Sequence, residues 1–299
     1  MGDHLLDPHN DFVFKRIFGS EENKDILLAF LNRTFMESNE PPLTDIILMN
    51  PYTEKDSPQD KQSILDIKAR TIDGKLINIE IQLFNRYDIE KRTLYYWSKM
   101  YSDQLVEGQP YRELKKCVAI NILNFPYLPN DQYHNIFHLR EQRSSIPLSD
   151  DLEIHFMELP KLDDSTVPVD GGLANWLLFL KGVNKSAWEV LTMNEPMLKK
   201  AMTVLEFLSY DAETRRLYEA RQKYLHDEAS LIEGAKTEGR AEGRAEGRAE
   251  GLAEGIAEGR AEGKEEMARR LLALGVDISV IAEASGLTEP EIKKLKPLQ

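Results

Sequence analysis

The residues of this chain best suited to chemistry are two carboxylates and an amide, Asp66, Glu80 and Gln82. They lie in two neighbouring segments, residues 63–70 and 75–83, and in each segment apolar and polar residues alternate. Alternation with a period of two is typical of a β-strand that buries one face, and the short link between the segments indicates a β-hairpin. The three polar side chains therefore share one face of the hairpin.

The register of this hairpin follows from its apolar residues. Ile64 apart, the first segment has them at odd positions, and so has the second: Leu65, Ile67 and Ala69, then Ile77, Ile79, Ile81 and Leu83. Directly opposed residues of an antiparallel pair share a face, so both sets must face one core. A two-residue turn of Asp73 and Gly74 would pair odd with even positions, a slip that is disfavoured when one face is buried. We predict a three-residue loop from Ile72 to Gly74, with Gly74 in the left-handed conformation of a bulged turn.

That register sets Asp66 directly opposite Glu80, and Ile64 opposite Gln82. Two opposed carboxylates lie close enough to share one divalent cation, and without a cation their like charges would destabilise the pair. The alternative is a strand that faces solvent, whose acids only keep the protein soluble. On spacing alone both interpretations stay open.

At these residues the chain resembles the PD-(D/E)XK nuclease superfamily, and within it the Rpn branch of recombination-promoting nucleases, also labelled transposases. The resemblance covers roughly residues 7–161. It implies an α/β fold with a restriction-endonuclease-like mixed sheet flanked by helices, followed by a C-terminal all-helical extension. It also implies that Asp66 and Glu80 bind Mg²⁺, or Mn²⁺ or another divalent cation, with help from the backbone carbonyl of Ile81.

Gln82 occupies the place that lysine holds in most of the superfamily. Its amide carries no positive charge, but it can orient a water molecule or contact a phosphate oxygen. A glutamate followed two residues later by glutamine is usual in the Rpn branch. The departure from lysine therefore bears on the rate of cleavage and on the number of bound metal ions more than on the resemblance to the family.

The start of the chain is also similar to the opening motif of the Rpn branch, in the run Asp11-Phe12-Val13-Phe14-Lys15-Arg16-Ile17-Phe18-Gly19. Asp11 would begin the first helix, where a carboxylate can cap free N–H groups, and this cap is the simpler interpretation. The functional interpretation makes Asp11 an outer acid of the metal site. Lys15 would contact phosphate, with an ordinary solvated lysine as the alternative.

A long helix is predicted for residues 87–106, with a buried stripe at spacings of three and four formed by Leu94, Trp97, Tyr101 and Leu105. The segment from Arg92 to Ser98 is again similar to the Rpn pattern. Basic side chains near a metal-bound phosphate position nucleic acid without reading its sequence. We expect Arg92 and Gln104 to contact DNA, although ordinary surface charges would give the same pattern.

Three further strands are predicted at residues 117–123, 133–139 and 152–158. The first is almost wholly apolar, as expected for a strand that is covered on both faces. His134 and His138 would share a face of the second strand, but too far apart to bind one ion. We interpret these two histidines as structural.

The acids outnumber the bases and give the chain a formal net charge of -13, which argues against nucleic-acid binding through bulk charge. A bound cation and a few arginines can still reverse the field locally. No apolar run approaches the about 20 residues of a membrane span, and the amino end has no apolar signal segment. With one cysteine, these features predict a cytoplasmic protein that does not enter membranes.

The chain is expected to have four parts: a PD-(D/E)XK nuclease-like core at 1–165, a helical region packed on the core at 166–230, an Ala-Glu-Gly-Arg repeat helix or spacer at 231–265 and a helix-turn-helix-like tip at 266–299. Each repeat glycine costs a helix about 1 kcal/mol relative to alanine. A stable repeat helix therefore needs a partner, such as the small-residue face of another helix. A homo-oligomer through this glycine/alanine face and a charged spacer are the two alternatives, of which we favour the spacer.

The tip is predicted to contain three short helices: one that ends at Leu274, one that begins at Ile278, and one opened by a capping box of Thr288 with Glu291. In helix-turn-helix units such a third helix enters a DNA groove. Glu289 and Glu291 at its start would repel phosphates, so a protein-contact module is an equally open interpretation.

These features together predict a metal-dependent DNA endonuclease that hydrolyses phosphodiester bonds, linked by resemblance to recombination or transposition. Asp66, Glu80, Gln82 and Asp11 would form its catalytic group, and DNA would be its partner. The alternative is a non-catalytic protein with a degenerate nuclease site, either associated with DNA or built as an oligomeric interaction protein.

Overall fold

The structure is a computed structural model that describes residues 5–50, 66–85, 88–163, 172–182 and 188–295. The chain divides into two compact units, Met1–Ala229 and Ser230–Gln299. No helix among the described residues is long and apolar enough to cross a lipid bilayer.

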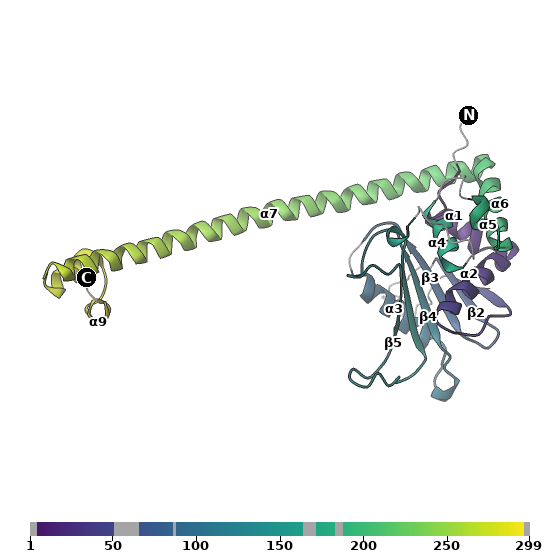
Figure 1. Ribbon diagram of the computed structural model, residues 1–299, viewed down its shortest axis with the longest axis horizontal. Helices are drawn as coiled ribbons and strands as arrows, with labels where there is room; N and C mark the ends of the chain where they lie inside the picture. The colour runs from purple at the N-terminus through teal and green to yellow at the C-terminus, as the bar shows by residue number, and fades with distance from the viewer. Residues whose placement is uncertain (1–4, 51–65, 86–87, 164–171, 183–187, 296–299) are drawn as a thin grey trace. The chain divides into compact units, whose positions relative to one another are not determined.

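The first unit is built around a six-stranded mixed sheet with the strand order β1-β2-β3-β4-β6-β5 (Figure 1). Its strands are β1 (Ile46–Met49), β2 (Ile67–Thr71), β3 (Leu76–Gln82), β4 (Cys117–Leu123), β5 (His134–His138) and β6 (Leu152–Glu158). The pairs β1–β2, β2–β3 and β5–β6 are antiparallel, whereas β3–β4 and β4–β6 are parallel. The predicted mixed sheet and its strands 117–123 and 152–158 are confirmed, and the strand predicted at 133–139 is one residue shorter at each end.

Helices cover the two faces of the sheet unequally. The helices of the first unit are α1 (Asp11–Phe18), α2 (Lys24–Glu37), α3 (Ile89–Ser102), α4 (Leu173–Lys181), α5 (Trp188–Thr192) and α6 (Pro196–Tyr210), with 3₁₀ turns at Glu21–Asn23, Tyr111–Glu113 and Leu159–Lys161. Odd-numbered residues of β2 and β3 face a large core shared with α1, α2, α4 and α6, in which the rings of Phe18, Phe30 and Trp176 pack together. The opposite face is covered over β3 and β4 by α3.

The predicted register of the β2–β3 hairpin is confirmed. Ile67 pairs with Ile79 and Ala69 with Ile77, and the backbone N–H of Thr71 donates to the carbonyl of Lys75 at 2.9 Å. Three residues, from Ile72 to Gly74, therefore form the loop, and Gly74 has the expected positive φ of 94°. Continued by one residue, this register sets Asp66 opposite Glu80. The predicted pairing of Ile64 with Gln82 lies outside the described residues.

The buried stripe predicted on the helix after β3 is confirmed only in part: Trp97 and Tyr101 pack against a buried cluster of β3, β4 and α3, but Leu94 does not. Leu94 is 48 % exposed, whereas Ile89, Thr93 and Met100 are the buried residues of α3. The helix is turned because the sheet face beneath it carries polar residues. Thr93 donates a hydrogen bond from its hydroxyl to Asn121 Oδ1 of β4 at 3.0 Å, a contact that spacing of apolar residues cannot reveal.

The helix α7 (Ala212–Ala273) begins in the first unit and contains the whole Ala-Glu-Gly-Arg repeat. A Cβ added at any repeat glycine from Gly239 to Gly263 would meet no other described atom within 4 Å. The described part of the chain therefore offers no packing partner that would offset the cost of these glycines. The four-part division at 165, 230 and 265 stays a prediction. Helices α4 and α6, which follow the first of these boundaries, belong to the same hydrophobic core as the sheet.

The second unit ends in α8 (Ile278–Ser285) and α9 (Glu289–Lys294), which pack on the end of α7 through Ala268, Ile281 and Ile292. The capping box of Thr288 and Glu291 is confirmed. The first predicted tip helix is not separate, because the helix that precedes Gly275 is the continuous end of α7.

Replacing Gly243, Gly247 and Gly251 by alanine should stabilise α7 by up to about 1 kcal/mol per site, because each site is open and alanine is the better helix former. Thermal unfolding followed by far-ultraviolet circular dichroism measures this gain. Gly286→Ala serves as the control: its φ of 69° strains any side chain, so this variant should lose stability. A concentration-dependent loss of stability in the triple alanine variant would instead show that the glycine face packs against a second copy.

Candidate active site

A cavity of about 440 Å³ lies where the carboxyl end of β3 meets the start of β2. Five elements that are distant in sequence supply its polar lining: Asp11 and Lys15 from α1, Asp66 beside β2, Glu80 and Gln82 from β3, Arg92 from α3 and Arg221 from α7. The backbone of Ile81 also borders it. Of the residues that the sequence singled out for chemistry, only Gln104 is not part of this lining.

Asp66 is held in place by both neighbouring elements. Its Oδ2 accepts a hydrogen bond from the backbone N–H of Ile81 at 2.9 Å, and its Oδ1 lies 2.9 Å from the ammonium nitrogen of Lys15. Burial raises the pKa of Asp66, and the charge of Lys15 opposes that rise. The carboxylate is therefore fixed against the end of β3, at the position where the hairpin register brings it opposite Glu80.

Glu80 is buried, with an exposed fraction of 7 %, and its Oε1 has no hydrogen-bond partner among the described residues. Burial raises the pKa of Glu80 to about 8, and the nearby charge of Asp66 adds to the rise. Gln82 is also buried, at 9 % exposure. The alternative of a solvent-facing strand is wrong, because β3 is a central strand covered on both faces.

These residues fit a divalent cation. Mg²⁺ and Mn²⁺ prefer oxygen ligands, and the cavity offers two buried carboxylates, one of which has an oxygen without a partner. A bound cation would relieve the mutual repulsion that helps keep Glu80 protonated. The backbone carbonyl of Ile81 as a third ligand stays a prediction, although the N–H of the same residue already orients Asp66.

Asn10, not Asp11, is the N-cap residue of α1, and it accepts a bond from the N–H of Phe12 at 3.0 Å. Asp11 Oδ1 also accepts from that N–H, at 2.9 Å, so the expected bond to a free helix N–H is present. Asp11 faces the cavity as well, where the guanidinium of Arg221 binds both of its carboxylate oxygens, with a distance of 2.9 Å from Nε to Oδ1. Sequence reasoning missed Arg221. It stands in a helix rich in charged residues, 210 positions after its partner, and no local pattern distinguishes it from its neighbours.

Arg92 of α3 lines the same cavity and lies near Glu80. Its charge lowers the pKa of Glu80, against the larger effects of burial and Asp66, and its guanidinium carbon lies 5.9 Å from the ring centroid of Tyr96. Gln104 is separated from this group. Its amide binds the peptide of Lys115 on both sides, donating to the carbonyl at 3.0 Å and accepting from the N–H at 2.9 Å.

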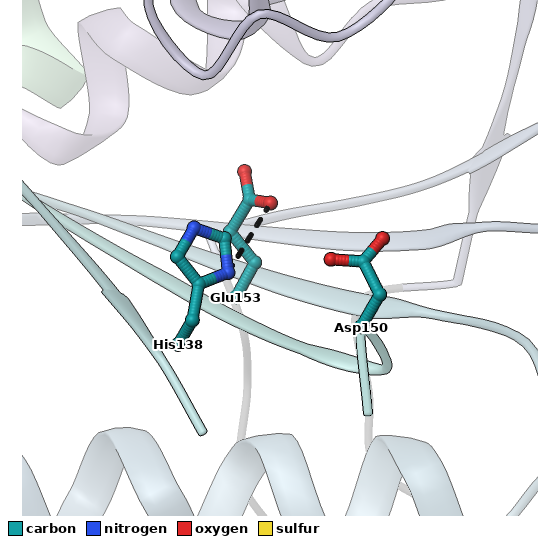
Figure 2. A group of neighbouring side chains, drawn as sticks. All are labelled: His138, Asp150 and Glu153. Atoms are coloured by element: carbon teal, nitrogen blue, oxygen red, sulfur yellow. Dashed lines mark ion pairs between the residues drawn. The ribbon is translucent and has the colours of Figure 1, made fainter. Parts of the chain in front are cut away.

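A second group of potential ligands, His138, Asp150 and Glu153, lies near the β5 edge of the sheet (Figure 2), with ligand atoms within 4.8 Å of one another. The ammonium of Lys116 already lies between its acids, 2.6 Å from Glu153 Oε2 and 3.0 Å from Asp150 Oδ2. Burial would raise the pKa of Glu153, but hydrogen bonds from His155 and Lys116 outweigh it and hold that pKa at about 2. A lysine thus supplies the positive charge here, and we assign no metal to this group.

The two histidines interpreted as structural have protein partners. His134 Nδ1 lies 2.6 Å from Glu37 Oε2, and its ring stacks on that of His155 with centroids 5.1 Å apart. His138 Nδ1 lies 4.0 Å from Glu153 Oε2. His134 does not belong to the group of potential ligands around Glu153.

Glu80→Gln should make the metal-free protein less sensitive to pH. The pKa of Glu80 is about 8 in the folded chain and near 4.5 ordinarily, so its contribution to stability is complete below about pH 4.5 and is lost as the pH rises towards 8. Glutamine cannot ionise, so the variant should exceed the unchanged chain in stability at about pH 8.5 and approach it near pH 5. Urea unfolding in the presence of a chelator measures the stability of the variant and of the unchanged chain at both pH values.

The exposed acid Glu90 on α3 provides the matched control, because a bond from Tyr127 lowers its pKa. Glu90→Gln should give no gain at high pH. A Glu80→Gln variant that is less stable than the unchanged chain at about pH 8.5 would contradict the raised pKa.

Comparison with known families gave two matches. Residues 8–235 match the model described as PD-(D/E)XK nuclease family transposase, and residues 261–297 match the model described as Rpn/YhgA-like nuclease family, C-terminal HTH domain. Comparisons with curated proteins and with solved structures each found no match.

The first family match covers the sheet, its flanking helices and the part of α7 that carries Arg221. It agrees with the fold, a restriction-endonuclease-like α/β sheet with a helical extension. The second match covers the end of α7 together with α8 and α9. The chain therefore belongs to the PD-(D/E)XK nuclease transposase family, in its Rpn/YhgA-like branch.

Proposed function

We propose that the protein is a metal-dependent DNA endonuclease that hydrolyses phosphodiester bonds. The observation that carries this proposal is the pair of Glu80, which is buried, and Asp66, whose side chain is 11 % exposed; Glu80 has a carboxylate oxygen with no hydrogen-bond partner among the described residues. Such a pair is costly without a cation, because burial and like charge both disfavour ionisation. The family, with its nuclease region and its helix-turn-helix domain, supports a DNA-related function.

Asp66 and Glu80 would hold the cation. When bound, a divalent ion polarises the scissile phosphate and lowers the pKa of a water molecule. The protein's part is to orient both carboxylates towards the cation. The N–H of Ile81 fixes Asp66, and the paired Arg221 and Asp11 form one wall of the same cavity.

Lys15 and Arg92 flank the acid pair and are suited to the phosphate oxygens. Lys15 now neutralises Asp66 at 2.9 Å, a role that a bound cation would take over and so free the ammonium for the substrate. Arg92 lines the same cavity from α3. The amide of Gln82 can orient the attacking water or donate to a phosphate oxygen, but it cannot supply positive charge. Lys15 and Arg92 would therefore provide the positive charge that lysine contributes elsewhere in the superfamily.

The C-terminal helix-turn-helix unit supports DNA as the partner. Its last helix has Glu289 and Glu291 in its first turn, and Lys293 and Lys294 in its last. We infer that this unit contributes to targeting, with its lysine end nearer the phosphates, because acids at a helix start repel the DNA backbone. We favour a charged spacer as the role of the α7 repeat; a homo-oligomer formed through the repeat is the alternative.

Asp66→Ala and Glu80→Ala should each abolish Mg²⁺-dependent nicking of supercoiled plasmid. Loss of the cation removes several kcal/mol of transition-state stabilisation, roughly 10³-fold in rate. The matched control is Asp150→Ala, which removes an acid from the group neutralised by Lys116 and should keep full activity. Circular dichroism checks that each variant is folded. Undiminished cleavage by either active-site variant would exclude the metal assignment.

Gln82→Ala should be milder than the loss of either acid, with a decrease of about 10- to 100-fold in rate, because the amide orients and does not carry charge. Plasmid nicking at saturating metal separates the two effects. Equal losses in Gln82→Ala and Glu80→Ala would assign the glutamine a larger role than orientation. Gln82→Lys tests whether the residue common in the superfamily is tolerated here.

A further inference from the structure

A second cavity, of about 430 Å³, opens on the same face of β2 that carries the acid pair. Three of its lining residues are cations: Lys68 and Arg70 from β2, and Lys115 from the segment before β4. Met100 and Gln104, from α3 and the residues after it, form the opposite wall. We call this cavity the β2 pocket. The activity proposed above does not use any of these cations.

The register of β2 fixes where the β2 pocket lies relative to Asp66. Residues two apart on a strand share a face, so Lys68 and Arg70 follow Asp66 on one face at intervals of about 6.6 Å. Arg70 is therefore about 13 Å along the strand from the metal-binding acid. A chain of phosphates that leaves the scissile position along β2 would pass these cations in turn.

The three cations have no ion-pair partner among the described residues, although the charge of Lys115 helps to lower the pKa of Asp73 in the hairpin loop. Arg70 and Lys115 are exposed. By contrast, Lys75 and Lys116 both pair with Glu40. Asp103, the acid in the pocket lining, lies 3.7 Å from the ammonium of Lys99. In a chain of net charge -13, unpaired cations on one face are a local exception.

The peptide and the side-chain stem of Lys115 both have defined contacts. Gln104 binds both the N–H and the carbonyl of its peptide. The stem of Lys115 also lies over the hairpin loop, where a Cβ at Gly74 would come within 3.2 Å of its Cγ. Gly74 is thus required twice, by its φ of 94° and by this close approach. Gln104, expected from the sequence to touch DNA, acts here as a positioning residue for Lys115.

We propose that the β2 pocket binds backbone phosphates of the DNA on one side of the scissile phosphate. This inference rests on the proposed function and extends its substrate contacts. Cations without an ion-pair partner, on a protein of opposite overall charge, suit phosphate recognition, because each contact releases condensed counterions and adds to affinity. Such contacts set the position of the DNA without reading its sequence.

The test compares two triple variants of the full-length chain. One is Lys68→Gln/Arg70→Gln/Lys115→Gln in the β2 pocket. The other removes the same charge from exposed cations elsewhere in the first unit, Arg143→Gln/Lys199→Gln/Arg216→Gln. Binding of a labelled duplex and of its single strand is measured with a chelator present, over a range of salt concentrations, so that cleavage does not interfere. Thermal unfolding of both triples should overlay that of the unchanged chain.

The pocket triple should flatten the slope of log affinity against log salt by about 2 to 3, and should weaken binding on the order of 10²-fold at 0.1 M salt. The control triple should leave the slope within about 1 of the unchanged chain. Equal slopes in the two triples would overturn the inference. Absence of measurable DNA binding by the unchanged chain would overturn it too. Plasmid cleavage by the unchanged chain in Mg²⁺ decides the proposed function separately in either case.

Gln104 gives an independent check. Gln104→Ala should weaken DNA binding less than Lys115→Ala, and in the double variant it should add nothing to the loss, because the glutamine acts through Lys115. Additive losses in the double variant would contradict this positioning role. A merely structural role would lower the melting temperature without this dependence on Lys115.

Discussion

Two carboxylates buried side by side are the constraint on which the rest of this structure depends. Burial and mutual repulsion both raise the pKa of Glu80, which reaches about 8, and burial raises that of Asp66. Such an arrangement lowers the stability of the metal-free fold, so it persists only where other interactions outweigh it. The cations Lys15 and Arg92 lower this cost in part, and both line the same cavity.

The fold provides the stability that this pair requires. The acids stand on β2 and β3, whose other face is locked into a large apolar core with α1, α2, α4 and α6. Helix α3 then covers β3 from the opposite side and makes the pair a buried one. Arg221 of α7 adds a wall to the cavity through its bond to Asp11. The elements that form the site are thus held in place mainly by packing contacts outside it.

The hairpin could be predicted from the sequence because its information is local. A period of two and one glycine determine which residues oppose each other, so Asp66 and Glu80 could be paired without a structure. Arg221 could not, since its contact with Asp11 depends on where a distant helix crosses the first one. The residue type of Gln104 permits the expected DNA contact, whereas in the fold its amide binds the peptide of Lys115. The burial of Thr93 on α3 is equally hard to predict, because its partner Asn121 is polar and leaves no apolar pattern.

The measurement that tests the proposed metal site most directly is calorimetric titration of the metal-free protein with Mn²⁺, repeated in buffers of different ionisation enthalpy. With the pKa of Glu80 at about 8, binding near pH 7 should release close to one proton, and the release should vanish well above pH 8. The apparent affinity should rise with pH over the same range, and Asp66→Asn should abolish binding. Binding that releases no proton near pH 7, or that survives in Asp66→Asn, would contradict the account.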